Sequence, residues 1–171
     1  LDVLARAVVA YLAAQAAAGA QALMVFDTWG GLLSPRMFGE FSQRWLAQIV
    51  AGLKAREATR EVPVILFSKG ANGHLETLAD SGCDALGLDW TIDIAAARER
   101  VGARVALQGN LDPAVLAASP ETIRAEARRV VDGFGPHPGH VFNLGHGITP
   151  DIDPAHVAVL VDAVHEFGRR G

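Results

Sequence analysis

The chain has 171 residues, of which 50% are hydrophobic and 20% are charged, and this balance is typical of a globular protein with a sizeable core. Its formal net charge of −4, without a block of basic residues, argues against nucleic-acid binding. No apolar stretch approaches the roughly 18 residues of a membrane span, and the single cysteine, Cys83, is compatible with a reducing compartment. We therefore expect one cytoplasmic domain over residues 1–171, with neither nucleic acid nor membrane as a partner.

Helical segments and short apolar runs alternate along the chain. In chain order, we expect a helix over residues 1–18, a strand over 22–27, a helix over 34–54, a strand over 62–68, a helix over 74–80, a strand over 85–90, a helix over 94–101, a strand over 105–110, a helix over 119–134, a strand over 141–145 and a helix from 153 onward. Ser34-Pro35, Ser119-Pro120 and Asp153-Pro154 predict helix starts, because the first residue of each pair can act as a cap and proline fits the first turn.

This alternation of five strands and six helices indicates the α/β class. The strands are continuous apolar runs, as expected when both faces of a parallel sheet are buried. The pattern is compatible with a (β/α) barrel or with a doubly wound open sheet. In the last helix, the apolar residues fall on one face at helical spacing: Val157, Leu160, Val161, Val164 and Phe167.

Polar residues follow every predicted strand. They are Asp27-Thr28, Ser68-Lys69, Asp89-Trp90, Gln108 with Asn110, and Asn143 with His146. In both parallel architectures, functional groups collect beyond the carboxyl ends of the strands. We therefore expect these residues at one end of the sheet, with Thr28 and His146 lining the same concavity. The alternative is that they are polar only because loops begin there.

His146 is the sharpest candidate for a functional residue, because Gly145 and Gly147 flank it and glycine permits close approach of the backbone. Its imidazole could donate to a substrate carboxylate or move a proton, or it could be an ordinary loop histidine. The segment lacks the pattern of a dinucleotide-binding loop, since Pro150 stands where the last glycine of GxGxxG would be. The lone Cys83 has no partners for a zinc site, so we expect no metal.

Six motifs in this order resemble the uroporphyrinogen decarboxylase family over essentially the whole chain. They are FDTWGG (26–31), VILFSK (64–69), GLDW (87–90), LQGNLDP (107–113), FGPH (134–137) and NLGHG (143–147), the last followed by PDIDP (150–154). The resemblance implies a (β/α)₈ TIM barrel, of which this chain would form a partial barrel with the last five parallel strands. Side chains such as Val25, Leu66 or Leu88, depending on the register, would then point into the barrel.

The resemblance also implies a reaction and a substrate. The family removes carbon dioxide from the four acetate side chains of uroporphyrinogen III, giving coproporphyrinogen III in heme biosynthesis, without cofactor or metal and as a cytoplasmic homodimer. Carried over by motif, Thr28 would be a substrate-binding hydroxyl, His146 would contact the substrate and Phe26 would pack against the macrocycle. The aspartate and arginines of the family belong to its first three strands. We therefore expect no catalytic residue in this chain, and no activity of the chain alone.

Two other readings remain open at this point. A corrinoid-dependent methyltransferase of the same superfamily would need zinc ligands where this chain has Phe67, Lys69 and His146. A barrel fragment could also serve as a non-catalytic binding module.

Lys69 is the only cationic residue that directly follows a predicted strand, although the implied substrate carries eight carboxylates.

Overall fold

A computed structural model describes residues 1–169 of the chain. The elements fall into two compact units, Leu1–Gly87 and Leu88–Gly171, and both alternate helices with strands. The single domain expected over 1–171 stays a prediction. Among the described residues, no helix has the length and apolar character needed to cross a membrane.

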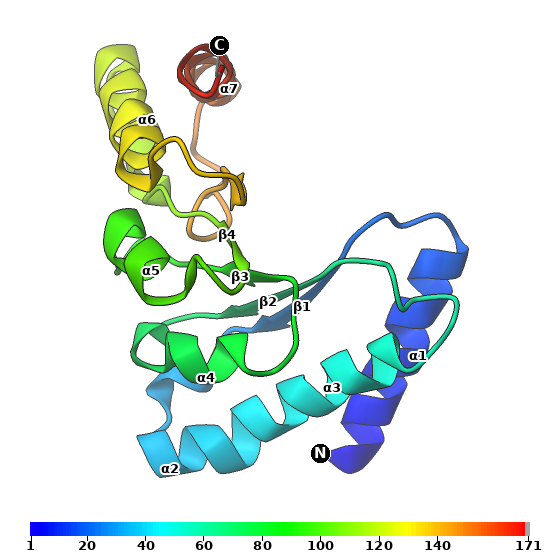
Figure 1. The fold of residues 1–171 in the computed structure, drawn as a ribbon. Coiled ribbons are helices and arrows are strands. Elements are labelled where there is room, and N and C mark those ends of the chain that lie inside the picture. Colours follow the sequence, from blue (N-terminus) through cyan, green and yellow to red (C-terminus); the bar gives the residue numbers. More distant parts are fainter. Residues whose placement is uncertain (170–171) are drawn as a thin grey trace. The chain divides into compact units, whose positions relative to one another are not determined.

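The first unit contains three parallel strands and their connecting helices (Figure 1). Its elements are α1 (Asp2–Ala17), β1 (Leu23–Asp27), the 3₁₀ turn η1 (Gly30–Leu32), α2 (Pro35–Phe38), the π-helical turn η2 (Gly39–Gln43), α3 (Arg44–Lys54), β2 (Val64–Ser68), the 3₁₀ turn η3 (Asn72–His74), α4 (Leu75–Ala79) and β3 (Ala85–Gly87). The helix expected over 34–54 is therefore present, with a π turn in its middle. Ser34 occupies its N-cap position but makes no side-chain capping bond, so the helix begins at Pro35 without that bond.

The register of β1 and β2 decides which side chains face the helices. Val25 pairs with Leu66, and Asp27 pairs with Ser68 two residues further along. Ser42, in the helical segment, donates a hydrogen bond to the Asp27 carboxylate, so this face of the sheet is the one covered by helix. Alternate residues of a strand share a face, and Val25 and Leu66 therefore point to the helices. The expectation that these two side chains point into the barrel is wrong for this register.

The amino ends of β2 and β3 are fastened to α3 by one lysine. Lys54 Nζ donates to the carbonyl of Val62 at 3.2 Å and forms an ion pair with Asp84 at 2.7 Å. The same Asp84 oxygen accepts the backbone N–H of Val64 at 2.7 Å. A lysine at the end of a helix is also favourable for the carbonyls that lack helical partners there. Lys54 and Asp84 thus hold the helix end and the two strand starts together.

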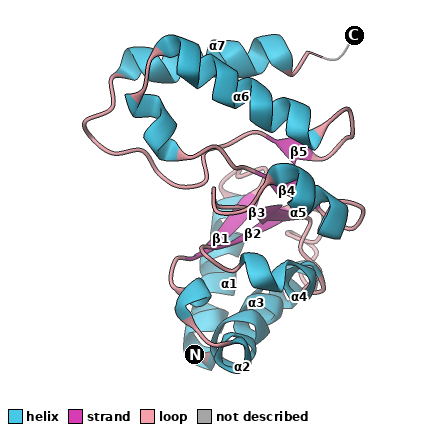
Figure 2. Cartoon of the chain, turned by 90° about the vertical axis from the view of Figure 1, so that its left-hand side faces the viewer, coloured by secondary structure: helices cyan, strands magenta, loops and turns pink. Residues whose placement is uncertain are grey.

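The second unit contains β4 and β5, which are also parallel, and helices that pack against one another (Figure 2). Its elements are α5 (Ile94–Val101), β4 (Ala106–Gln108), the 3₁₀ turn η4 (Pro113–Ala117), α6 (Pro120–Phe134), β5 (His140–Val141) and α7 (Pro154–Phe167). Asp93, Asp112, Ser119 and Asp153 each accept a backbone N–H at the start of the following helix. These caps explain why the helices begin at those residues.

Two predicted elements of this unit differ from the structure. The strand expected over 141–145 is only His140–Val141, followed by an isolated bridge between Leu111 and Leu144. The side chain of Asn143 accepts the N–H of Leu144, which gives that backbone group a local partner instead of a strand partner. In α7, four of the five residues of the predicted apolar face are buried or half-buried, whereas Val161 is exposed and Ala163 is buried instead.

Replacing Asp84 by alanine tests the fastening of α3 to the strands. The variant leaves Lys54 without its ion pair and Val64 N–H without its acceptor, and we expect it to lose about 1–2 kcal/mol of unfolding free energy, since the site is half-exposed. Urea denaturation measures the change. The exposed Asp162 on α7 provides the control, and its alanine variant should unfold like the parent. Equal stability of the Asp84 and Asp162 variants would show that the fastening contributes nothing.

Candidate functional site

The carboxylate of Asp27, at the end of β1, is a structural group. Its Oδ2 accepts the hydroxyl of Ser42 at 2.5 Å and the hydroxyl of Ser68 at 3.0 Å. Ser68 is buried at the end of β2, and Ser42 is buried in η2. Asp27 therefore ties two strands and the helical segment together below the strand ends, instead of facing a ligand.

After the carboxyl end of β1, two glycines allow close packing that a side chain would prevent. A Cβ added to Gly30 would overlap the Asp27 carboxylate and the Ser68 hydroxyl. A Cβ on Gly31 would overlap the backbone of Lys69 and Gly70, because Gly31 N–H donates to the Lys69 carbonyl at 3.1 Å. The FDTWGG motif is thus explained by close approach of the backbone.

Phe26 lies on the other face of β1 from Asp27, because successive residues of a strand point to opposite faces. The Phe26 ring is 66% exposed and meets the Phe67 ring edge to face, with 5.8 Å between the centroids. Thr28 is exposed directly after the strand, two residues beyond Phe26. The first unit therefore presents one exposed aromatic ring, with a hydroxyl two residues further along the chain, and these groups suit a ligand that has both rings and anionic groups.

In the second unit, two of the predicted polar residues shape the chain. Asp89 is 2% exposed, and its Oδ1 accepts both the N–H and the hydroxyl of Thr91. Asn110 is also buried and donates to the carbonyls of Asp89 at 2.9 Å and Ile92 at 2.6 Å. Both residues therefore make hydrogen bonds that stabilise the local backbone.

His146 lies exposed at the end of the β4–β5 ladder. Gly145 N–H donates to the Leu111 carbonyl at 2.7 Å, and this bond fixes the backbone next to the histidine. The imidazole meets the indole of Trp90 edge to face, with centroids 6.4 Å apart and planes at 87°. Gly145 is needed because an added Cβ would lie 2.5 Å from Trp90 N. Trp90 belongs to the GLDW motif, but only the structure shows that its ring contacts that of His146.

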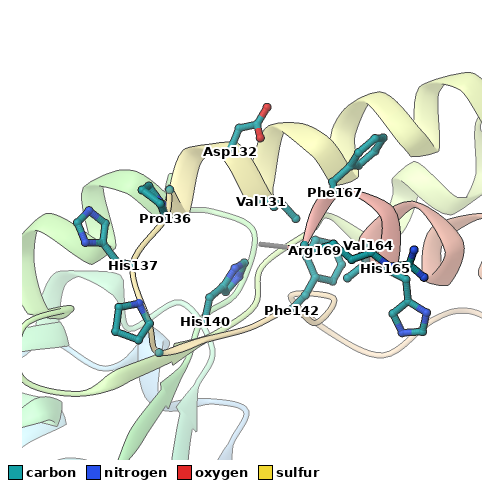
Figure 3. Close-up of a pocket in the computed structure, with 14 residues that line it drawn as sticks. Val131, Asp132, Pro136, His137, His140, Phe142, Val164, His165, Phe167 and Arg169 are labelled. Carbon is teal, nitrogen blue, oxygen red and sulfur yellow. The ribbon is translucent and has the colours of Figure 1, made fainter. Parts of the chain in front are cut away.

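A hollow of about 870 Å³ lies elsewhere, at the amino end of β5 between α6 and α7 (Figure 3). Its lining includes His137, His140, Phe142, His165 and Phe167. The ring of His140 stacks on Phe134 and its Nε2 lies 2.8 Å from the Gly109 carbonyl, so this histidine has a packing role. None of the predicted site residues lines the hollow. We therefore define the candidate site by the residues that follow the carboxyl ends of the strands, and not by this hollow.

The remaining reactive groups have structural surroundings. Burial raises the pKa of the Cys83 thiol, which makes it a poor nucleophile. In the PDIDP segment, a hydrogen bond from the Thr149 side chain lowers the pKa of Asp151, and Asp153 caps α7. No cluster of three or more histidine, cysteine or acidic side chains that could hold a metal occurs within residues 1–169. Thr28 and His146 belong to different units, so their shared concavity stays a prediction.

The chain is similar to known proteins over almost its whole length. The family model described as uroporphyrinogen decarboxylase (URO-D) matches residues 1–167. A protein from Thioalkalivibrio sulfidiphilus named uroporphyrinogen decarboxylase is 64% identical over 170 residues, covering 99% of this chain and 48% of the relative. One of the same name from Alcanivorax borkumensis is 59% identical with the same coverage. The chain thus spans about half the length of the curated relatives it matches.

A solved structure has the same fold. It is a methyltransferase from Methanosarcina mazei, with a TM-score of 0.83 and 26% sequence identity, covering 98% of this chain and 48% of the other. The match to half of a longer chain agrees with five parallel strands taken from an eight-stranded barrel. The expected fold class, a partial (β/α)₈ barrel, is confirmed.

The close approach at Gly30 can be tested with alanine. Gly30→Ala places a methyl group on the Asp27 and Ser68 side chains, and we expect it to lower the unfolding free energy by about 1–3 kcal/mol. The matched control is Gly39→Ala, since Gly39 is helical and has no neighbour within 4 Å of an added Cβ. The control should gain about 0.5–1 kcal/mol. If both variants unfold alike in urea, the Asp27 network does not depend on Gly30.

Proposed function

The chain belongs to the uroporphyrinogen decarboxylase family, and we propose that it supplies the carboxyl-terminal half of an enzyme that converts uroporphyrinogen III to coproporphyrinogen III. The observation that carries the proposal is the 64% identity with a protein of that name over 99% of this chain. The reaction removes the carboxyl groups of four acetate side chains, so the enzyme is a carboxy-lyase of heme biosynthesis.

The first unit would bind the macrocycle and part of its negative charge. Phe26 offers an exposed ring, supported from the side by Phe67, against which a pyrrole can pack. Thr28 follows directly after β1, and its exposed hydroxyl can donate to a substrate carboxylate. Lys69 directly follows β2, and its charge favours an anionic substrate at this end of the sheet.

The second unit would bind the substrate through His146. Its exposed imidazole can donate a hydrogen bond to a carboxylate, and a charged acceptor makes such a bond stronger than one between neutral groups. Thr28, His146 and Phe26 are therefore proposed as substrate-binding residues. We assign no catalytic residue to this chain, because the aspartate and arginines that the resemblance gives to the chemistry belong to the amino-terminal half of the family's barrel.

The reaction proposed here uses the substrate as its own electron sink. Addition of a proton to a pyrrole carbon gives a cationic ring. The electron pair of the bond to the departing carboxylate flows into that ring, and carbon dioxide leaves. The resulting methylene carbon takes a proton to become a methyl group, and the ring carbon then releases the proton it had gained, which restores the pyrrole. No cofactor or metal is then required, and the residues of this chain bind and orient the substrate. We further propose that the complete enzyme is a cytoplasmic homodimer, which the family resemblance supports.

The methyltransferase alternative is less well supported. The Methanosarcina mazei structure shares the fold at 26% identity, whereas the curated relatives named above are identical at 59% or more. At the positions of the zinc ligands of a corrinoid-dependent methyltransferase, this chain has Phe67, Lys69 and His146. None of these residues supplies the thiolate that such a zinc site uses. The non-catalytic alternative is separated from our proposal by the activity test that follows.

The 171 residues alone should not decarboxylate uroporphyrinogen, because five strands cannot close an eight-stranded barrel. The complete enzyme, meaning residues 1–171 joined to the amino-terminal half of the Thioalkalivibrio sulfidiphilus relative, should produce coproporphyrinogen. Chromatography of the oxidised porphyrins measures the product. The unmodified relative is the positive control. Product from the isolated chain, or none from a folded complete enzyme, contradicts the proposal.

Two substitutions test the binding residues in the complete enzyme. Thr28→Ala and His146→Ala each remove one hydrogen bond to a carboxylate and should lower kcat/KM by an amount equivalent to about 1–3 kcal/mol. Thr28→Ser keeps the hydroxyl and should retain activity. The control is His165→Ala on α7, an exposed histidine outside the site. A collapse of Tm in either alanine variant, or kinetics equal to the control, would remove that residue from the site.

A further inference from the structure

His146 and Trp90 form an aromatic pair at the end of the β4–β5 ladder. Their ring centroids are 6.4 Å apart and their planes are nearly perpendicular, at 87°. This is the edge-to-face arrangement that aromatic rings prefer over a face-to-face sandwich. The histidine is exposed, and the indole is 36% exposed beside it. The two rings therefore meet at the molecular surface, where a ligand can reach them.

The backbones of the two residues are also held together. Gly145 is buried, and its Cα packs so close to the chain at residues 89–90 that an added Cβ would lie 2.5 Å from Trp90 N. The N–H of Gly145 donates to the Leu111 carbonyl at 2.7 Å. His146 is the next residue, so the position of its Cα relative to Trp90 is fixed by packing and by this hydrogen bond.

Trp90 itself stands on an anchored segment. Asn110 donates to the carbonyls of Asp89 and Ile92, on either side of Trp90, and Asp89 in turn accepts the N–H of Thr91 at 2.8 Å. On the far side of the histidine, Gly147 has no neighbour within 4 Å of an added Cβ. The backbone around His146 is thus confined at Gly145 and open at Gly147.

We propose that Trp90 is a positioning residue, whose indole holds the His146 imidazole in the orientation in which it donates to a substrate carboxylate. The inference rests on the proposed function. A neighbouring carboxylate would also orient an imidazole, but it would repel an anionic substrate. An aromatic neighbour orients the ring without adding negative charge. The identity of residue 90 should therefore matter for binding the substrate, although its side chain donates no proton to the reaction.

A double-mutant cycle in the complete enzyme tests this proposal. We expect Trp90→Ala to lower kcat/KM about as far as His146→Ala, at least about tenfold, and Trp90→Phe to restore most of the loss. Because Trp90 acts through His146, the double variant should be no worse than His146→Ala alone. Additive losses, or a Trp90→Ala variant as active as the parent, would overturn the proposal. Thermal melting of each variant separates a loss of activity from unfolding.

A spectroscopic measurement distinguishes failure of this inference from failure of the proposed function, because it needs no turnover. The chain has three tryptophans, so Trp29→Phe with Trp45→Phe leaves Trp90 as the only tryptophan of residues 1–171, and excitation at the red edge of the indole band avoids Tyr11. The added amino-terminal half should carry phenylalanine at its tryptophans too. The emission of an indole depends on the groups that contact it, so removal of the imidazole beside Trp90 should change that emission at constant pH.

We expect His146→Gln to change the emission of Trp90, since it removes the ring that contacts the indole. His165→Gln is the matched control and should leave the emission unchanged. Emission that is the same in His146→Gln as in the parent overturns the contact between the rings. If the pairing is seen by fluorescence but the complete enzyme makes no coproporphyrinogen, the proposed function fails while the pairing stands.

Discussion

The hydrogen-bond network of the half-buried Asp27 carboxylate is the interaction on which the first unit depends. The carboxylate accepts two hydroxyl groups, one from Ser42 in the helical segment and one from Ser68 at the end of the neighbouring strand. Donors of this kind offset the cost of removing a charged group from water. Because successive residues of a strand point to opposite faces, fixing Asp27 toward the helices fixes Phe26 toward the other side. Thr28 follows directly after the strand and is exposed. The candidate site of this unit therefore follows from a hydrogen-bond network that takes no part in it.

The second unit uses the same principle with different groups. Asn110 and Asp89, both buried, hold the turn that carries Trp90, and Gly145 packs against that turn. The polar residues closest to the strand ends are thus engaged in holding the backbone. Thr28, which follows Asp27, and His146, which follows Gly145, are by contrast exposed. Most residues of the FDTWGG and NLGHG motifs therefore stabilise the backbone, and only one or two side chains of each motif are proposed to contact the substrate.

The proposed chemistry also accounts for what this chain lacks. A substrate with eight carboxylates needs several cations, yet the chain is net acidic, and among the cationic residues within 1–169 only Lys69 directly follows a strand. The chain spans about half of its curated relatives, and the family resemblance assigns the arginines and the aspartate to the other half. Hydroxyl and imidazole donors on a rigid scaffold are suited to orienting an anion whose charge is balanced by groups from elsewhere.

The sequence by itself determined the elements, the α/β class and the family, since these depend on local signals. Apolar runs, Ser-Pro and Asp-Pro helix starts and short ordered motifs are all read from neighbouring residues, and the structure has a strand or a helix in each predicted place. Only the tertiary structure decided which faces and which polar groups are available. A shift of one residue in register reverses the faces of a strand, so Val25 and Leu66 could not be assigned from the chain alone. The hydroxyl partners of the Asp27 carboxylate, Ser42 and Ser68, lie 15 and 41 residues away, and Asn110 lies 21 residues from the Asp89 carbonyl to which it donates. No local sequence pattern indicates these contacts. For the same reason Trp90 became a neighbour of His146 only when the chain between them had folded.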